Sequence, residues 1–319
     1  MKKKLTLFVV IMMLAIFTAA CGAAEEKTGG SSSEGKNTES NELTIEHQLG
    51  ETKVKQNPKK VVVFDFGTLD TMDKLGIEPA GLPKDNIPKY LEKFKDEKYG
   101  NTGGLMEPDF EAINELQPDL IIISGRQQDS YEQFQEIAPT IFMGLDTTKY
   151  MESFKGNVTK LGQIFDKEDL AKEELAKVEA DIQKLNEKAS PSDKKALIIL
   201  ANDGKISAYG KNSRFGLIHD VFGVDAADEN IEVSKHGQSI SFEYIVEKNP
   251  DYLFVVDRGA VVEGGTSSAK NVVENDLVKN TNAYKDNNIV YLSPDYWYLS
   301  GGGLISVAEM VKEIDKGIE

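Results

Sequence analysis

Apolar and polar positions follow helical and strand patterns in turn along the chain, and one segment with both patterns occurs twice. Residues 110–126 read FEAINELQPDLIIISGR, and residues 242–258 read FEYIVEKNPDYLFVVDR. Both start with Phe-Glu, place Pro-Asp eight and nine positions after the Phe, continue with a mostly apolar run and end in Arg. The offset is a constant 132 residues (242 minus 110), which is too long for a solenoid repeat. The pattern therefore predicts two similar lobes, each with the same helix-turn-strand unit.

The segments around the two units show the same alternation of strand and helix patterns. The run KKVVVFDF (59–66) is typical of a covered strand, and residues 69–75, followed by Gly76, have helical spacing. Further strands are predicted at 120–124, 140–144, 194–203, 206–210 and 288–293, and further helices at 130–137, before Phe222 and at the C-terminus. Strands that alternate with short helices indicate an α/β fold. We expect two Rossmann-like lobes with a ligand cleft between them, because ligands of open α/β sheets bind beyond the carboxyl ends of the strands.

A long helix is predicted between the two halves. Residues 150–189 contain no proline, and four apolar positions have 3-4-3 spacing: Leu175, Val178, Ile182 and Leu185. A helix of about 24 residues from Lys167 would be about 36 Å long. It could be an ordinary amphipathic helix inside one domain, but its place between the repeated units favours a rigid connector. The predicted lobes are then residues 43–145 and 191–319, joined by a connecting helix in 146–190.

The first 42 residues predict export and a lipid anchor. Residues 1–20 combine a Lys-rich start with an apolar run, which is typical of a secretory signal peptide. Cys21, the only cysteine of the chain, follows at once and has no partner for an internal disulfide. Its position resembles a lipobox, in which the cysteine is acylated. Residues 21–42 are mostly polar or small and predict a flexible tether.

The charges of the chain indicate which class of ligand it binds and which residues would bind it. The formal net charge of −16 argues against binding to nucleic acid or to anionic lipid. Of 37 Lys and Arg residues only three are Arg: Arg126, Arg214 and Arg258. Two of them close the repeated units, and the third lies in a Gly- and Ser-flanked turn. Each alone is best explained by pairing with an acidic residue, but as a set they favour one shared oxyanion site.

Several other residues are candidates for the same site. Lys84, in a Pro-rich turn, would add a fourth cation, and Tyr209, Trp297 and Tyr298 could stack on rings or cations. For the aromatic residues the alternative is core packing, and for Trp297 the two interpretations are equally balanced. His236, in SKHGQS, is either a ligand donor or a residue of a surface loop.

The glutamates at the second position of both units are also candidates. A carboxylate near a helix start is stabilised by the helix dipole by roughly 0.3–1 kcal/mol, which is a sufficient structural reason for Glu111 and Glu243. Matching positions on two lobes would also present two negative groups to a two-fold symmetric partner.

These features together resemble the siderophore-binding lipoproteins of ABC iron importers, the class III solute-binding proteins. The resemblance extends from Cys21 to the C-terminus. The pattern EPDxExIxxxxPDLI is shared by the superfamily, whereas VVVFDFGTLDTMDKLG, KNSRFGLIHDVFGV, HGQS and WYLSGGG are similar to the petrobactin-binding members.

The resemblance implies a function and roles for these residues. Basic residues in the cleft, here Lys84, Arg126, Arg214 and Arg258, would hold an anionic ferric catecholate, and the siderophore would carry the iron. Ferric petrobactin is a trianion, which suits this number of cations, whereas hydroxamate complexes are roughly neutral. Glu111 and Glu243 would dock onto arginines of the permease dimer. The protein would be a monomer without catalytic activity or an intrinsic cofactor, lipid-anchored on the outer face of the cell membrane.

Other classes are less consistent with the sequence. A secreted hydrolase would need a nucleophile motif, but GxSxG, HExxH and a Cys-His pair are missing. Three scattered His residues argue against a direct Zn or Mn receptor. A structural or adhesive lipoprotein would not explain the positions of the arginines. Heme and cobalamin remain alternative ligands within the favoured class.

Overall fold

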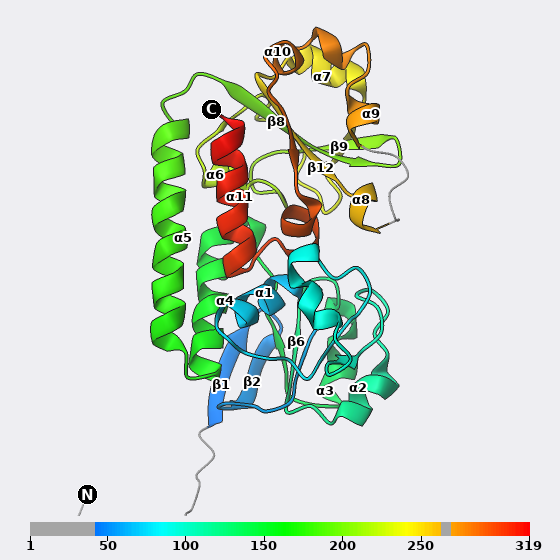
Figure 1. Ribbon diagram of the computed structural model, residues 1–319, viewed down its shortest axis with the longest axis vertical. Coiled ribbons are helices and arrows are strands. Elements are labelled where there is room, and N and C mark those ends of the chain that lie inside the picture. Colours follow the sequence, from blue (N-terminus) through cyan, green and yellow to red (C-terminus); the bar gives the residue numbers. More distant parts are fainter. Residues whose placement is uncertain (1–41, 263–268) are drawn as a thin grey trace, which may run out of the picture. The chain divides into compact units, whose positions relative to one another are not determined.

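The computed structural model describes residues 42–262 and 269–319, in which two main β-sheets are each accompanied by helices (Figure 1). The predicted signal peptide, Cys21 and nearly all of the predicted tether lie outside the described residues. The first sheet is parallel, in the order β5-β4-β3-β6-β7. Its strands are β3 (Val61–Val63), β4 (Gly81–Leu82), β5 (Gly100–Asn101), β6 (Leu120–Ile123) and β7 (Thr140–Phe142). An antiparallel hairpin, β1 (Glu42–His47) and β2 (Gly50–Lys55), packs beside β7.

The second sheet is mixed, in the order β11-β9-β8-β12-β13, with β10 also paired to β8. Strands β8, β12 and β13 are parallel, whereas β9 and β11 are antiparallel to their neighbours. The strands are β8 (Lys195–Asn202), β9 (Lys205–Tyr209), β10 (Asp225–Ala226), β11 (Gln238–Ile240), β12 (Tyr252–Asp257) and β13 (Ile289–Leu292). The two sheets with their helices, called the first and second lobe below, confirm the predicted α/β fold class.

Short helices connect the strands of both lobes. In the first lobe they are α1 (Phe66–Lys74), η1 (Lys89–Lys95), α2 (Phe110–Leu116), η2 (Gln128–Ser130) and α3 (Tyr131–Gln135). In the second lobe they are α6 (Leu217–Asp220), α7 (Phe242–Lys248), α8 (Gly259–Val262), α9 (Ala269–Val273), η4 (Val278–Asn280) and α10 (Asn282–Lys285).

The strand predicted at 59–66 is shorter than expected. It ends at Val63, because Asp65 caps helix α1: its Oδ1 accepts a hydrogen bond from the backbone N–H of Thr68 at 2.7 Å. The three residues of β3 are fully buried, and the apolar Phe66 belongs to the helix instead. Asp65 therefore lies where the chain turns from strand to helix, at the carboxyl end of β3.

The segment between the lobes is a helical hairpin rather than a single helix. After η3 (Thr147–Lys149), α4 (Tyr150–Ile164) packs against α5 (Glu168–Ala189), and the C-terminal α11 (Leu304–Gly317) packs against both α5 and α1 (Figure 1). Helix α5 has 22 residues and buries the four apolar positions with 3-4-3 spacing, as predicted. The domain boundaries at 145 and 190 stay predictions.

Candidate functional site

The two repeated units have the same local structure, and it explains most of their shared residues. Asp109 caps α2 by accepting from the N–H of Ala112, and Ser241 holds the same position before α7 without a side-chain cap bond. Both helices end in a left-handed residue, Gln117 (φ 47°) or Asn249 (φ 42°), just before the proline. This ending reverses the chain so that the following strand can enter the sheet.

The aspartate of each Pro-Asp pair binds backbone N–H groups at the start of the neighbouring strand, β3 in the first lobe and β8 in the second. Asp119 Oδ2 accepts from the backbone N–H groups of Lys59 and Lys60 at 2.9 and 3.0 Å. Asp251 Oδ2 accepts from the N–H of Lys195 at 2.9 Å. The Pro-Asp pair is thus explained by folding alone, whereas the arginine after each strand needs another explanation.

That explanation is a turn of π-helix, η5 (Asp295–Ser300), called the Tyr298 turn below. The backbone N–H of Gly301 bonds back five residues to Tyr296 O at 2.7 Å, and Gly301 itself is left-handed with φ 59°. The last carbonyl groups of such a turn lack partners within it and carry partial negative charge. The carbonyls of Tyr298 and Leu299 are therefore open to outside donors.

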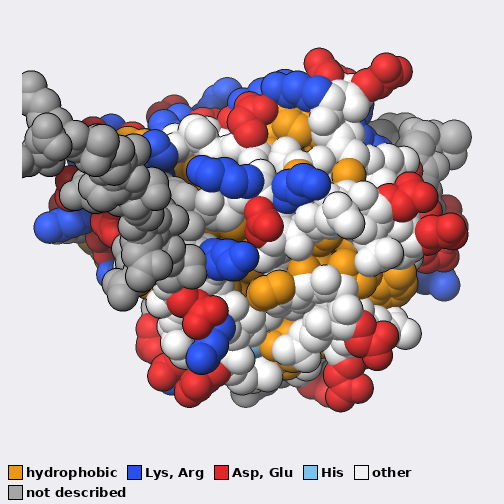
Figure 2. All heavy atoms as spheres, turned by 90° about the horizontal axis from the view of Figure 1, so that it is seen from below, with side chains coloured by type: hydrophobic (Ala, Val, Ile, Leu, Met, Phe, Trp, Pro, Cys, Tyr) orange, Lys and Arg blue, Asp and Glu red, His pale blue; other side chains and the backbone are white. Residues whose placement is uncertain are grey.

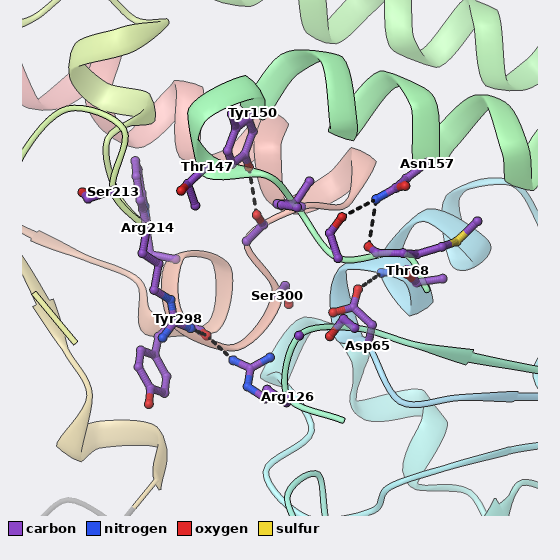
Figure 3. A pocket seen from close by; sticks show the side chains of 18 of the residues that line it. Asp65, Thr68, Arg126, Thr147, Tyr150, Asn157, Ser213, Arg214, Tyr298 and Ser300 are labelled. Carbon is purple, nitrogen blue, oxygen red and sulfur yellow. Dashed lines mark hydrogen bonds between the residues drawn. The ribbon is translucent and has the colours of Figure 1, made fainter. Parts of the chain in front are cut away.

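All three arginines contact this turn, and Figure 3 shows two of them, Arg126 and Arg214. Arg126 Nη2 donates to Tyr298 O at 2.8 Å and its Nη1 to Leu299 O at 3.5 Å, and Arg214 Nη2 donates to Tyr298 O as well. Arg258 Nε donates to the Tyr298 hydroxyl at 2.8 Å, and its Nη1 donates to Asn202 Oδ1 at 2.7 Å. The guanidinium carbon of Arg214 lies 4.2 Å from the centre of the Tyr298 ring. The convergence that the sequence predicts is thus present, with Tyr298 at its centre.

The cluster is strongly cationic. Among the described residues, no Asp or Glu forms an ion pair with Arg126 or Arg214. Burial, followed by the charge of Arg126, lowers the pKa of Arg214 to about 10, so it remains protonated at neutral pH. Burial alone would raise the pKa of the Tyr298 phenol, but the hydrogen bond from Arg258 and the charges of the three arginines lower it overall. The site thus favours negatively charged oxygen.

This positive charge is local. On the part of the molecular face in Figure 2 that the structure describes, basic and acidic side chains are interspersed, and neither sign forms a continuous patch. For a chain of net charge −16, a local cluster is the arrangement that the composition requires of an anion site.

A cavity of about 440 Å³ lies beside the cluster and is lined from both lobes. Arg126 lines it from the first lobe, Arg214 and Lys235 from the second, and Trp297 and Tyr298 from the turn. Trp297, which is 2% exposed, donates from Nε1 to Glu313 Oε2 at 2.8 Å. This volume is within the range of small-molecule sites, about 300–1,000 Å³.

Four candidates lie outside this cavity's lining: Arg258, which contacts Tyr298 as described above, and three others. Lys84 lines a separate hollow, where its ammonium donates to the carbonyls of Phe94 and Asp96 at 3.0 and 2.7 Å. Tyr209 is 2% exposed and packs edge-on against Phe215, which is the core-packing alternative. His236 is exposed, although the preceding Ser234 and Lys235 line the cavity. The structure does not gather Lys84 and His236 with the arginines, whereas Tyr209 lies close enough to Arg214 and Arg258 for their charges to act on the pKa of its phenol.

The two glutamates are exposed at equivalent positions. Glu111 and Glu243 are the second residues of α2 and α7. The backbone N–H of Glu243 and the side chain of Ser241 lower the pKa of Glu243. Both positions are open to a partner, and their docking role stays a prediction.

Sequence reasoning missed several residues of the cavity wall. Tyr150 and Asn157 come from α4; Tyr150 donates to Gly301 O and Asn157 Nδ2 to Met143 O, both at 2.8 Å. Their helix has an ordinary amphipathic pattern, so no signal marked them. Asp65 and Ser124 did carry a signal, because each is a polar residue that directly follows a buried strand.

Comparisons with known proteins place the chain in a family. The model of the periplasmic binding protein family matches residues 61–296, so the chain belongs to this family. It is 58% identical over 293 residues to the petrobactin-binding protein YclQ of Bacillus subtilis (strain 168), covering 91% of this chain and 92% of that protein. The ferric-anguibactin-binding protein FatB of Vibrio anguillarum is 33% identical over 282 residues, covering 87% and 88%.

Solved structures agree with this assignment. The structure of YclQ from Bacillus subtilis matches with a TM-score of 0.85 and 59% identity, covering 87% of this chain and 99% of that one. The periplasmic catecholate-siderophore binding protein VctP from Vibrio cholerae matches with a TM-score of 0.83 and 38% identity, covering 86% and 99%.

The described residues contain neither a membrane-spanning helix nor a metal-binding group of side chains. None of their helices is both long and apolar enough to cross a membrane. Nor do three or more His, Cys, Asp or Glu side chains of this part of the chain gather as a metal site.

Proposed function

We propose that this protein is an extracytoplasmic receptor for an anionic ferric catecholate siderophore of the petrobactin type, and that it delivers its ligand to an ABC permease. The observation that carries the proposal is the meeting of Arg126, Arg214 and Arg258 at the Tyr298 turn, beside a cavity lined by both lobes. Three guanidinium groups suit a multiply charged oxyanion, because each charge-assisted hydrogen bond contributes about 1.5–3 kcal/mol. The relatives named above, which bind petrobactin, ferric anguibactin and catecholate siderophores, support the same ligand class.

The ligand would reach donors that are already in place. Arg214 uses one of its three nitrogens in hydrogen bonds to described residues, so its fork remains open to an oxyanion. Trp297 and Tyr298 offer aromatic surface in the same cavity. The iron would be held by the siderophore, and the protein would act as a binding protein without catalysis.

The proposal extends to the anchor and the partner. Acylation of Cys21 would hold the protein at the outer face of the cell membrane, with residues 22–42 as the tether. Glu111 and Glu243 would contact the permease dimer, one from each lobe. The matching register of the two glutamates supports a two-fold symmetric partner.

A titration panel tests the ligand class. Trp297 is the only tryptophan of the chain and lines the cavity, so its fluorescence reports on binding directly. We expect ferric petrobactin and a ferric triscatecholate to quench it saturably, and hemin and cobalamin to leave it unchanged. Binding of hemin or cobalamin without binding of either ferric catecholate would overturn the proposal.

A further inference from the structure

The first sheet has a topological switch point at the cavity. From β3 the chain continues to β4 and β5 on one side of the sheet, whereas β6 and β7 lie on the other side. Ligands of open α/β sheets bind beyond the carboxyl ends of the two strands at such a point. Asp65 follows β3 and Ser124 follows β6, and the two strands are neighbours in register. Topology alone thus marks these two side chains, and both line the cavity.

The polar groups at this point have capacity left for a ligand. Asp65 Oδ1 accepts the cap bond from Thr68, and Oδ2 has no hydrogen-bond partner among the described residues (Figure 3). The hydroxyls of Thr68 and Ser124 also make no hydrogen bond to a described residue, and both residues line the cavity. These hydroxyl oxygens can therefore accept hydrogen bonds from a ligand in the cavity.

The charge of Asp65 is unusual at this place. The charged residues in the described lining are Arg126, Arg214, Lys235 and Asp65, so Asp65 is the one acid of an otherwise cationic cavity. Capping does not require its charge, because Asn caps a helix about as well as Asp. A carboxylate here would repel a purely anionic ligand but would attract a ligand with a positive group at its other end.

We infer that Asp65, Thr68 and Ser124 form a subsite for a protonated amine on an arm of the siderophore, opposite in charge to the arginine cluster. The inference rests on the proposed function and deepens it. Asp65 Oδ2 supplies the charge-assisted hydrogen bond, and the two hydroxyls accept the remaining N–H groups. The subsite makes Asp65 a determinant of specificity among ferric catecholates of equal core charge.

The test uses two synthetic ferric catecholates that differ only in one arm, which ends in a primary amine or in the same amine acetylated. We expect the wild-type protein to bind the amine form about 5- to 30-fold more tightly by Trp297 quenching. Asp65→Asn keeps the cap and removes the charge, so we expect the preference to fall below about twofold.

Asp109→Asn is the matched control, because Asp109 caps α2 by the same bond outside the cavity lining. It should keep the wild-type preference. An unchanged preference in Asp65→Asn, or equal wild-type affinity for the two forms, would overturn the subsite and leave the proposed function standing. Failure of the wild-type protein to bind either compound would overturn both.

Discussion

The two repeated units share a backbone and differ in what their arginines hold. In the first lobe, Arg126 donates to the carbonyls of Tyr298 and Leu299. In the second lobe, Arg258 holds the side chains of Tyr298 and Asn202. The repetition places one arginine at the edge of each sheet. The Tyr298 turn has no counterpart in the repeat, so the two arginines bind different groups of it.

The turn and the start of α11 after it are bound to the first lobe, although the turn follows a strand of the second. Asp70 of α1 is fully buried and accepts from the N–H groups of Ile305 and Ser306, both at 2.7 Å, and from the Tyr90 hydroxyl at 3.0 Å. The Tyr90 oxygen in turn accepts from the hydroxyl of Ser300, at the end of the turn, at 2.6 Å. Arg214 and Arg258 provide contacts from the other side. The comparison shows that the two repeated units place an arginine at the edge of each sheet, whereas a segment outside the repeat, the Tyr298 turn, provides the group on which the arginines meet.

The largest expected effect is the loss of siderophore uptake when the equivalent glutamates of the two units are both replaced. We expect Glu111→Ala combined with Glu243→Ala to abolish uptake of ferric siderophore by cells and to leave the dissociation constant unchanged. Each single variant should retain part of the uptake, because the partner is expected to be two-fold symmetric. Uptake of radiolabelled iron and quenching titrations measure the two properties.

The control for this experiment lies on the same helices. Glu115 and Glu247 are exposed and also 132 residues apart (247 minus 115), so Glu115→Ala with Glu247→Ala removes the same charge from equivalent positions. Normal uptake by the Glu111 and Glu243 double variant would refute docking at these residues.

Asp70, which binds Tyr90 and the start of α11, predicts that the free energy of unfolding depends on pH. Burial raises the pKa of Asp70 to about 6, against 3.8 for the unfolded chain. Between these values folded Asp70 binds more protons than unfolded Asp70, so its contribution to the free energy of unfolding should fall as pH rises from about 4 to about 6 and should level off above. The part due to Asp70 is about 3 kcal/mol. Urea titrations of wild type and Asp70→Asn across this range check it; equal pH slopes would contradict it.

The arginines of the two units should differ in their contribution to binding. Arg126 lines the cavity, whereas Arg258 supports the Tyr298 hydroxyl from outside the lining. We expect Arg126→Ala to weaken ferric-siderophore binding by about 2–3 kcal/mol and Arg258→Ala by about 1 kcal/mol. Lys98→Ala, which removes an exposed cation paired with Glu78, serves as the control in quenching titrations. Equal losses for the two arginine variants would show that the units contribute alike.

The smallest expected effect concerns the shared frame. Asp119→Ala and Asp251→Ala each remove a partly exposed acceptor of backbone N–H groups, so each should lower the free energy of unfolding by about 1–2 kcal/mol. The two losses should agree within about 0.5 kcal/mol, because the role is the same. Asp193→Ala, at an exposed position, should change stability by less than about 0.5 kcal/mol. Urea denaturation measures all three.

The sequence predicted those parts of the fold that depend on local patterns. The helix caps, Pro-Asp pairs and 3-4-3 spacing indicated α2, α7 and α5, because apolar periodicity and turn chemistry act within a few residues. The meeting of the arginines followed from the rule that strand ends share an edge. The strand at 59–66 was overextended, because Asp65 serves the next helix and the apolar Phe66 gave no sign of it.

The remainder of the site depends on contacts between distant segments. The π-helical turn at 295–300 has neither strand nor α-helical periodicity, and its residues are held by Tyr90 and the arginines. Lys84 was grouped with the arginines as a fourth cation and again by resemblance, but its ammonium donates to two carbonyls elsewhere. Such pairings are set by tertiary structure and leave no pattern in one sequence.

The carbonyl of Tyr298 has a consequence for discrimination among ions. Two guanidinium groups from different lobes share this one backbone oxygen, which therefore competes with any incoming anion for their N–H groups. For these two N–H groups, chloride or phosphate from the medium must outcompete an acceptor that is held in place at high effective concentration. An ion of low valence gains too little by doing so, and only a ligand that engages several donors at once displaces the oxygen or surrounds it.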